Sequence, residues 1–231
     1  MSRRLGLLGG TFDPIHYGHL DAADAAQRTL SLDEVRLLPA HDPPHRPADP
    51  RATVFHRFAL VALAIESRAG YVASDEELRR EGPSYTIDTL RAQHRDGWKP
   101  SQLFFIIGAD AFAEIATWHE YPAVLDATNF AVIARPGTTI EAALARVPEL
   151  HPRTQLAMAG CVQTSDCTSI FLIEAQTRDI SSTTIRARLA ARQPIDDLVP
   201  ASVARHIVAH HLYGTVDELH GQNIRRRSQS I

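Results

Sequence analysis

The stretch RLGLLGGTFDPIHYGHL, residues 4 to 20, decides the fold of this chain. An apolar run from Arg4 to Leu8 ends in Gly9-Gly10, and apolar residues then recur at helical spacing from Gly18 to Leu30. This order predicts a buried strand, a glycine-rich loop and a helix. In open α/β sheets such a loop lies at the carboxyl end of a strand and beside a helix N-terminus, where anions bind. The sequence therefore predicts a phosphate-binding loop at residues 9 to 19.

The rest of the chain alternates between strand and helix patterns. This alternation favours an α/β fold with a Rossmann-like, doubly wound parallel sheet, formed by a single domain over residues 1–214 with C-terminal helices. The pattern weakens between 138 and 168, and the role of that segment is not predicted. Residues 215–231 are basic and aperiodic, and are predicted to form a disordered tail. Further strands are predicted at 35–38, 70–73, 103–107, 130–134 and 170–173, and helices at 53–67, from the turn at 83–86 to 94, from 110 onward, and at 181–192 and 202–211.

Composition excludes several classes of protein. The chain has 231 residues, of which 44% are hydrophobic and 22% charged, as in ordinary globular enzymes. Its formal net charge of −3 provides no general basic field for nucleic acid, and its apolar stretches are too short to span a membrane. Cys161 and Cys167 are its only cysteines, too few for a disulfide framework. We expect a cytoplasmic protein that has no signal peptide and acts on small molecules. The sequence does not determine the oligomeric state, and a homo-oligomer is one alternative.

The first loop offers hydrogen-bond donors for phosphate oxygens. Gly9 and Gly10 let the backbone approach an anion closely, and His16 and His19 can each donate from a ring nitrogen. Neither the GxGxxG motif of dinucleotide-binding folds nor the GxxxxGK[ST] motif of P-loop NTPases occurs in the chain. A helix-capping or metal-binding histidine pair is the alternative interpretation of these two residues.

Two motifs give the chain a resemblance to a known superfamily. The sequence HYGH after GGTFDP resembles the HIGH-type nucleotidyltransferases, and ISSTTIR at 180–186 resembles the ISSTxIR element of the same superfamily. The segments LLPAHDPPHRP, GPSYTIDTL, FIIGADAFAEIATWHEYPAVL and ARPG narrow the resemblance to the bacterial nicotinate-nucleotide adenylyltransferases. The similarity covers residues 5–137 and 180–213. Cytidylyltransferases share HxGH but lack the GAD and PPHR elements, and pantetheine-phosphate adenylyltransferases lack the PSYT and tryptophan segments.

The resemblance implies a reaction and a set of site residues. The reaction is transfer of the adenylyl group of ATP to nicotinic acid mononucleotide, which yields nicotinic acid adenine dinucleotide (deamido-NAD) and pyrophosphate. Mg²⁺ is expected on the ATP phosphates, with no metal ligands assigned to the protein. His16, His19 and Arg186 are implied as catalytic. The implied ATP-binding residues are Gly9, Gly10, Thr11, Phe12, His16, His19, Gly108, Asp110, Ser181, Ser182 and Arg186. The implied mononucleotide-binding residues are His45, Arg46, Thr86, Trp118 and Arg135.

Two other hypotheses remain at this stage. A non-catalytic nucleotide sensor could use the same fold, since a fold does not determine a function. An RNA-binding protein could use the basic tail, although 6% aromatic residues favour no base-stacking surface. The chain also departs from the family pattern at His119, where a tyrosine is frequent, so packing around the pyridine ring is not predicted in detail.

Overall fold

Seven parallel strands form the centre of the molecule. The computed structural model describes residues 3–44, 50–134, 139–158 and 167–215. The strand order is β3-β2-β1-β4-β5-β7-β6, and every pairing is parallel. The predicted Rossmann-like fold is thereby confirmed. The strands are β1 (Leu5–Gly10), β2 (Glu34–Pro39), β3 (Tyr71–Ala73), β4 (Leu103–Gly108), β5 (Asn129–Ile133), β6 (Thr154–Leu156) and β7 (Ile170–Ile173).

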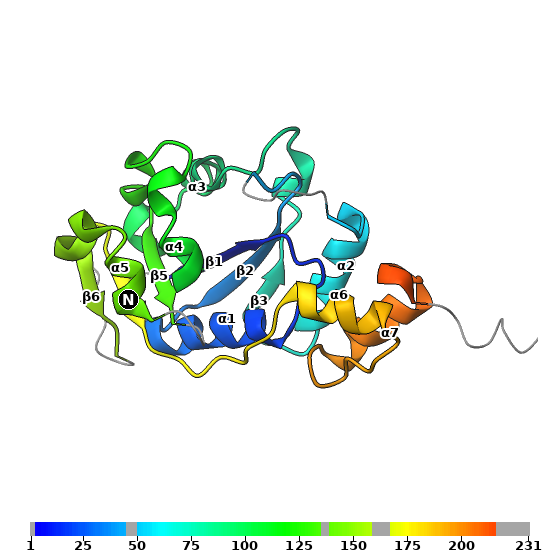
Figure 1. The fold of residues 1–231 in the computed structure, drawn as a ribbon. Coiled ribbons are helices and arrows are strands. Elements are labelled where there is room, and N and C mark those ends of the chain that lie inside the picture. Colours follow the sequence, from blue (N-terminus) through cyan, green and yellow to red (C-terminus); the bar gives the residue numbers. More distant parts are fainter. Residues whose placement is uncertain (1–2, 45–49, 135–138, 159–166, 216–231) are drawn as a thin grey trace, which may run out of the picture.

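Helices cover both faces of the sheet (Figure 1). Side chains of β4 show why: Phe104 and Ile106 join one buried cluster, while Phe105 and Ile107 join the other, as the alternation of a strand requires. One face packs against α1 (Tyr17–Leu30), α2 (Val54–Ile65), α6 (Ser182–Ala190) and α7 (Ala201–Ala209). The other packs against α3 (Thr86–Arg95), α4 (Ala109–Phe112) and α5 (Ile140–Leu144).

The segment from 138 to 168 contains elements that the sequence pattern did not predict. Residues 139–158 form α5, a short 3-10 helix (Pro148–Arg153) and β6, which pairs only with β7 in the described part of the chain. Helix α5 has only five residues, and β6 is the three-residue stretch Thr-Gln-Leu, which contains no apolar run such as the Tyr-Val-Ala of β3. Of the predicted tail, only residue 215 lies within the described residues.

The strand order reverses between β1 and β4. From β1 the chain proceeds outward through β2 and β3, and it then returns to β4 on the other side of β1. The loops that follow β1 and β4 therefore diverge and leave a crevice at the carboxyl edge of the sheet, which is where open α/β sheets bind ligands. The fold places both the residue 9–19 loop and the start of α4 at this edge.

A buried carboxyl group links the segment that follows β3 to helix α3 by a hydrogen bond. Glu77 begins a 3-10 helix (Glu77–Arg79) and is only 5% exposed. Its Oε1 accepts a hydrogen bond from the Thr89 hydroxyl at 2.7 Å, and Arg80 donates to that hydroxyl at 2.6 Å. Burial raises the pKa of Glu77 to about 7, although the hydrogen bond from Thr89 and the charge of Arg80 act in the opposite direction.

This raised pKa predicts a pH dependence of stability. Between the ordinary pKa of 4.5 and about 7, the folded chain keeps a proton on Glu77 that the unfolded chain has released. The contribution of the protonated Glu77 to the free energy of unfolding is complete below pH 4.5 and is lost as the pH rises to about 7. Glu77→Gln should remove this component, which amounts to about 2–3 kcal/mol in the free energy of unfolding.

Urea unfolding of both proteins between pH 4.5 and 8 measures this difference. The exposed Glu81 supplies a control, and Glu81→Gln should leave the pH profile of the native protein unchanged. Identical profiles for the native protein and Glu77→Gln would contradict the assignment of a protonated Glu77.

Candidate active site

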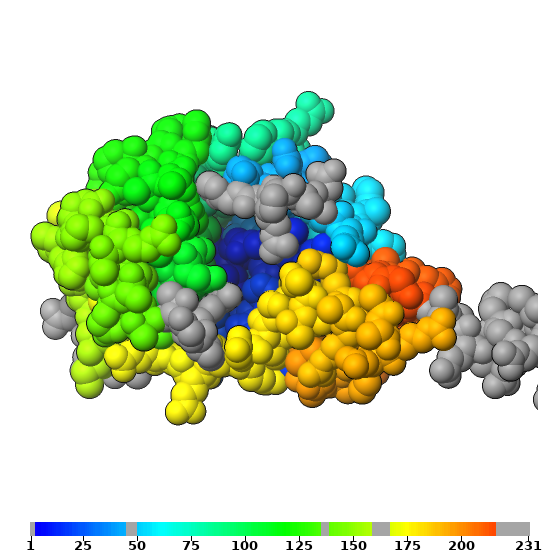
Figure 2. Space-filling view, viewed as in Figure 1, coloured from blue at the N-terminus to red at the C-terminus, as the bar shows by residue number. Residues whose placement is uncertain are grey.

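A cavity of about 500 Å³ opens at the carboxyl ends of β1, β2 and β4. It lies where the strand order reverses. Figure 2 shows the corresponding hollow, with the blue N-terminal segment at its floor and the green and yellow parts of the chain around it. Five regions of the chain line the cavity. They contribute residues 8–11 and 19; 40, 43 and 44; 77 and 84–86; 105–108, 110 and 111; and 118 and 119.

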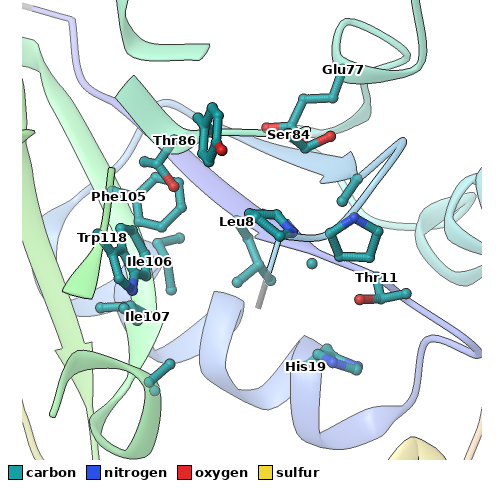
Figure 3. Close-up of a pocket in the computed structure, with 18 of the residues that line it drawn as sticks. Leu8, Thr11, His19, Glu77, Ser84, Thr86, Phe105, Ile106, Ile107 and Trp118 are labelled. Atoms are coloured by element: carbon teal, nitrogen blue, oxygen red, sulfur yellow. The ribbon is translucent and has the colours of Figure 1, made fainter. Parts of the chain in front are cut away.

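The two sides of the cavity differ in chemistry. Figure 3 shows His19 on one side, near Thr11, and the side chains of Thr86, Phe105 and Trp118 together on the other. Gly9, Gly10, Thr11 and His19 line the first side, as predicted for the phosphate loop. The arrangement thus joins a side suited to anions to an aromatic side suited to a flat ring.

His19 lies in the first turn of α1, and its ring orientation is defined. Its Nδ1 accepts a hydrogen bond from the backbone N–H of His16 at 3.3 Å. An accepting ring nitrogen carries no hydrogen, so Nε2 carries the proton of the neutral ring. The His16 ring lies 3.7 Å from the His19 ring, centroid to centroid. The local structure therefore makes His19 a hydrogen-bond donor through Nε2.

His16 and Phe12 do not line the cavity. His16 is the N-cap residue of α1 and is 3% exposed, while its carbonyl oxygen accepts the backbone N–H groups of His19 and Leu20. The Phe12 side chain is buried beneath Gly10, and its backbone has a positive φ of 50°. Both buried residues therefore contribute to the conformation of the loop. Their predicted contacts with ATP stay predictions.

Arg57 is a site residue that the sequence interpretation missed. It is 1% exposed, and its Nη1 donates to the carbonyl oxygen of Thr11 at 2.8 Å. Its Nη2 donates to the carbonyl oxygen of His41 at 3.4 Å, so one buried cation joins the loops that follow β1 and β2. The available signal was its place on the apolar face of α2, three and four residues before Leu60 and Val61, where an arginine is unusual.

Helix α6 packs directly against the phosphate loop. The Ser181 hydroxyl caps the helix by accepting the N–H of Thr184 at 3.0 Å, and the Ser182 hydroxyl donates to the carbonyl oxygen of Pro14 at 2.9 Å. Arg186 donates to the carbonyl oxygen of Asp13 at 2.7 Å. The structure thus brings the ISSTTIR element to the loop, as the two motifs together suggested, although none of its residues lines the cavity.

The aromatic side is built around Trp118. Its ring meets Phe105 edge to face, with centroids 5.8 Å apart and the planes at 90°. Next to it His119 stacks on Tyr85 with centroids 4.1 Å apart, so the histidine fills the place of the frequent tyrosine with another flat ring. The backbone N–H of Trp118 donates to the carbonyl oxygen of Ile115. Any backbone amide that this segment offers to a ligand must therefore come from a neighbouring residue.

The other predicted residues divide into two groups. Gly108 and Asp110 line the cavity at the end of β4 and in the first turn of α4, and Thr86 lines it at the start of α3. His45, Arg46 and Arg135 lie outside the described residues. Among the residues that the structure describes, no group of three or more His, Cys, Asp or Glu side chains is arranged to hold a metal ion. Within the same ranges, no helix is both long enough and apolar enough to cross a membrane.

Solved structures share this fold. Two structures of Plasmodium falciparum nicotinic acid mononucleotide adenylyltransferase, one complexed with APC and one with NaAD, match with a TM-score of 0.69. Each match covers 93% of this chain and 99% of the other at 18% sequence identity, a level at which the likeness concerns the fold alone.

Sequence comparison identifies the family. A family model described as cytidylyltransferase-like matches residues 7–188. A probable nicotinate-nucleotide adenylyltransferase of Symbiobacterium thermophilum is 40% identical over 213 residues, which cover 91% of this chain and 95% of the relative. One of Trichlorobacter lovleyi is 40% identical over 211 residues, 91% and 99% of the two chains. The chain therefore belongs to the cytidylyltransferase-like family and, within it, to the nicotinate-nucleotide adenylyltransferases.

Proposed function

We propose that this nucleotidyltransferase of NAD biosynthesis transfers the adenylyl group of ATP to nicotinic acid mononucleotide, releasing pyrophosphate and nicotinic acid adenine dinucleotide. The observation that carries the proposal is the single cavity that joins the His19 side of the loop to the Trp118 side. The relatives bear the name of this activity, and the Plasmodium enzyme has been solved with NaAD, the dinucleotide product proposed here. Production of the dinucleotide and pyrophosphate from the two substrates tests the proposal directly.

The reaction requires positioning more than proton transfer. The mononucleotide phosphate attacks the α-phosphorus of ATP in line, the bond to the β-phosphate oxygen breaks, and pyrophosphate leaves. A phosphate monoester has a second pKa of about 6 and is largely ionised at neutral pH, so the nucleophile needs no general base. His19 Nε2 would donate to a non-bridging oxygen of the α-phosphate and stabilise the charge of the transition state. His16 would assist at the triphosphate.

The donor side would bind ATP through three elements. Gly9, Gly10, Thr11 and Phe12 would present backbone to the phosphates, and Asp110, near Gly108, would accept hydrogen bonds from the ribose hydroxyls. Arg186, with Ser181 and Ser182, would hold the β- and γ-phosphate oxygens as pyrophosphate leaves. Arg186 donates through Nη1 to the carbonyl oxygen of Asp13 and through Nη2 to the Thr183 hydroxyl, and the N–H groups that these two bonds do not use would donate to the phosphates.

The acceptor side would bind the mononucleotide at both ends. Trp118 would stack on the pyridine ring, and the first amides of α3 at Thr86 would face the ring carboxylate, where the positive end of the helix dipole favours an anion. We place His45, Arg46 and Arg135 at the mononucleotide phosphate, since arginine forks suit a dianion.

Mg²⁺ is proposed to enter with ATP. Among the described residues, Asp110 and Glu77 are the carboxylates that line the cavity, too few for a metal site made by the protein alone, and Mg²⁺ commonly keeps its waters and binds through substrate phosphates. These residues fit an ion carried by the nucleotide, which would neutralise phosphate charge. A cytoplasmic location stays a prediction from the cysteine content.

His19→Ala should reduce turnover by a factor on the order of 10²–10³, because it removes a preorganised donor from the transition state. The fold should persist, since the side chain lies at the cavity wall. Steady-state pyrophosphate release measures the effect, and the exposed His151→Ala serves as the control. A His19→Ala protein with more than half of native turnover would refute the role of His19.

Arg186→Lys should impair the use of ATP more than that of the mononucleotide, because a point charge replaces a two-pronged donor. We expect kcat/KM for ATP to fall by about tenfold or more, with KM for the mononucleotide nearly unchanged. Arg188→Lys on the same helix is the matched control, because Arg188 pairs with Asp197 at 2.9 Å away from the loop. A change confined to the kinetic constants for the mononucleotide would contradict the assignment of Arg186 to the ATP phosphates.

The enzyme should prefer nicotinic acid mononucleotide over its amide. A carboxylate only accepts hydrogen bonds, whereas a carboxamide also donates, so backbone N–H groups around the ring would oppose the amide's NH₂. An unpaired contact of this kind costs about 1–3 kcal/mol, which corresponds to roughly 10- to 100-fold discrimination. The ratio of kcat/KM for the two acceptors at equal ATP and Mg²⁺ measures it. A ratio near one would leave adenylyl transfer intact but remove the nicotinate assignment.

A further inference from the structure

The last described turn of the chain reaches the phosphate loop. Tyr213 lies in the turn Leu212–Gly214 that follows α7, and Figure 1 shows this turn beside α6. Its hydroxyl donates a hydrogen bond to Oδ1 of Asp13 at 2.9 Å. Two residues 200 positions apart are thereby joined at the loop that leads into His19.

Asp13 links this turn to the groups that surround the phosphates. The side chain is 2% exposed, and its two oxygens also accept the backbone N–H groups of Arg51 and Ala52, at 2.9 and 3.0 Å. Arg186 donates to the Asp13 carbonyl oxygen at 2.7 Å and lies 3.8 Å from Oδ2. A buried carboxylate must be satisfied by hydrogen bonds, so loss of one donor forces the loop and Arg186 to readjust.

Backbone conformation supports a positioning role for this contact. Phe12 has a φ of 50° and Tyr213 a φ of 60°, both in the left-handed region that non-glycine residues seldom adopt. Such conformations persist only where surrounding contacts enforce them. Phe12 directly precedes the acceptor Asp13, and Tyr213 is the donor of the same hydrogen bond. Burial and the charge of Asp13 raise the pKa of Tyr213, which keeps its hydroxyl protonated as a donor.

We propose that Tyr213 is a positioning residue for adenylyl transfer. Through Asp13 it holds the loop and Arg186 in the geometry that binds the ATP phosphates. The proposal rests on the proposed function and adds the C-terminal turn to the machinery of that site. Tyr213 does not line the cavity, so its influence on the substrates must pass through Asp13.

The chain contains a matched control for this contact. The Tyr71 hydroxyl donates to Asp24, and the two residues join β3 to α1 away from the cavity. Tyr213→Phe and Tyr71→Phe each delete one tyrosine–aspartate hydrogen bond and leave the ring in place. Both should lower the melting temperature by similar amounts, so any kinetic difference between them reports on position in the site.

The test measures pyrophosphate release by the full chain with ATP and nicotinic acid mononucleotide. For Tyr213→Phe we expect kcat/KM for ATP to fall by about tenfold, with KM for the mononucleotide within about twofold of native, because small displacements of phosphate ligands have large effects on rate. Tyr71→Phe should keep native constants. Equal kinetics for the two variants, or a Tyr213→Phe chain that does not fold, would overturn the proposal.

A double-mutant cycle with Arg186→Lys tests the route of the effect. If Tyr213 acts through Asp13 on Arg186, Tyr213→Phe should change kcat/KM for ATP by less than about threefold in the Arg186→Lys background. Full additivity of the two effects would contradict that route. Absence of pyrophosphate release by the unmodified protein would contradict the proposed function instead, so the two failures are distinguishable.

Discussion

The structure of the site depends on how buried charged groups hold the loop between β1 and α1. Asp13 accepts two backbone N–H groups from the segment before α2, and Arg57 donates to the loop carbonyl of Thr11. Losing a hydrogen bond to a buried charge is costly, because no water is there to replace the missing partner. These contacts favour one shape of the loop, and that shape determines where the His19 ring lies.

This constraint would allow a small α/β domain to catalyse the proposed transfer without a general base. Preorganised donors contribute most when they need not move as charge develops. The hydrogen bond from the His16 backbone orients the His19 ring, and the sheet reversal places the aromatic wall around Trp118 across the same cavity. In the proposed mechanism both substrates would then meet at fixed positions, and most of the catalytic effect would come from their alignment.

Much of the fold and part of the site could be predicted from the sequence. The continuous apolar run of β4 and the motif-bearing loop after β1 are strong local signals, and the structure confirms the elements they predicted. Strand β6 could not be predicted, because its sequence Thr-Gln-Leu contains no apolar run, whereas the equally short β3 reads Tyr-Val-Ala. Arg57 and Tyr213 were missed for a different reason: their partners lie 46 and 200 positions away, and only the packing of α2 and α7 brings them together.

The most direct test of a preformed site is a crystal structure of the protein with a non-hydrolysable ATP analogue and nicotinic acid mononucleotide. The account predicts that the backbone from Thr11 to His19 keeps the course described above, with the Arg57 and Asp13 contacts intact. His19 Nε2 should then lie within hydrogen-bonding distance, about 2.7–3.2 Å, of an α-phosphate oxygen. A loop that rebuilds these contacts around the ligand, or a His19 ring directed away from the α-phosphate, would contradict it.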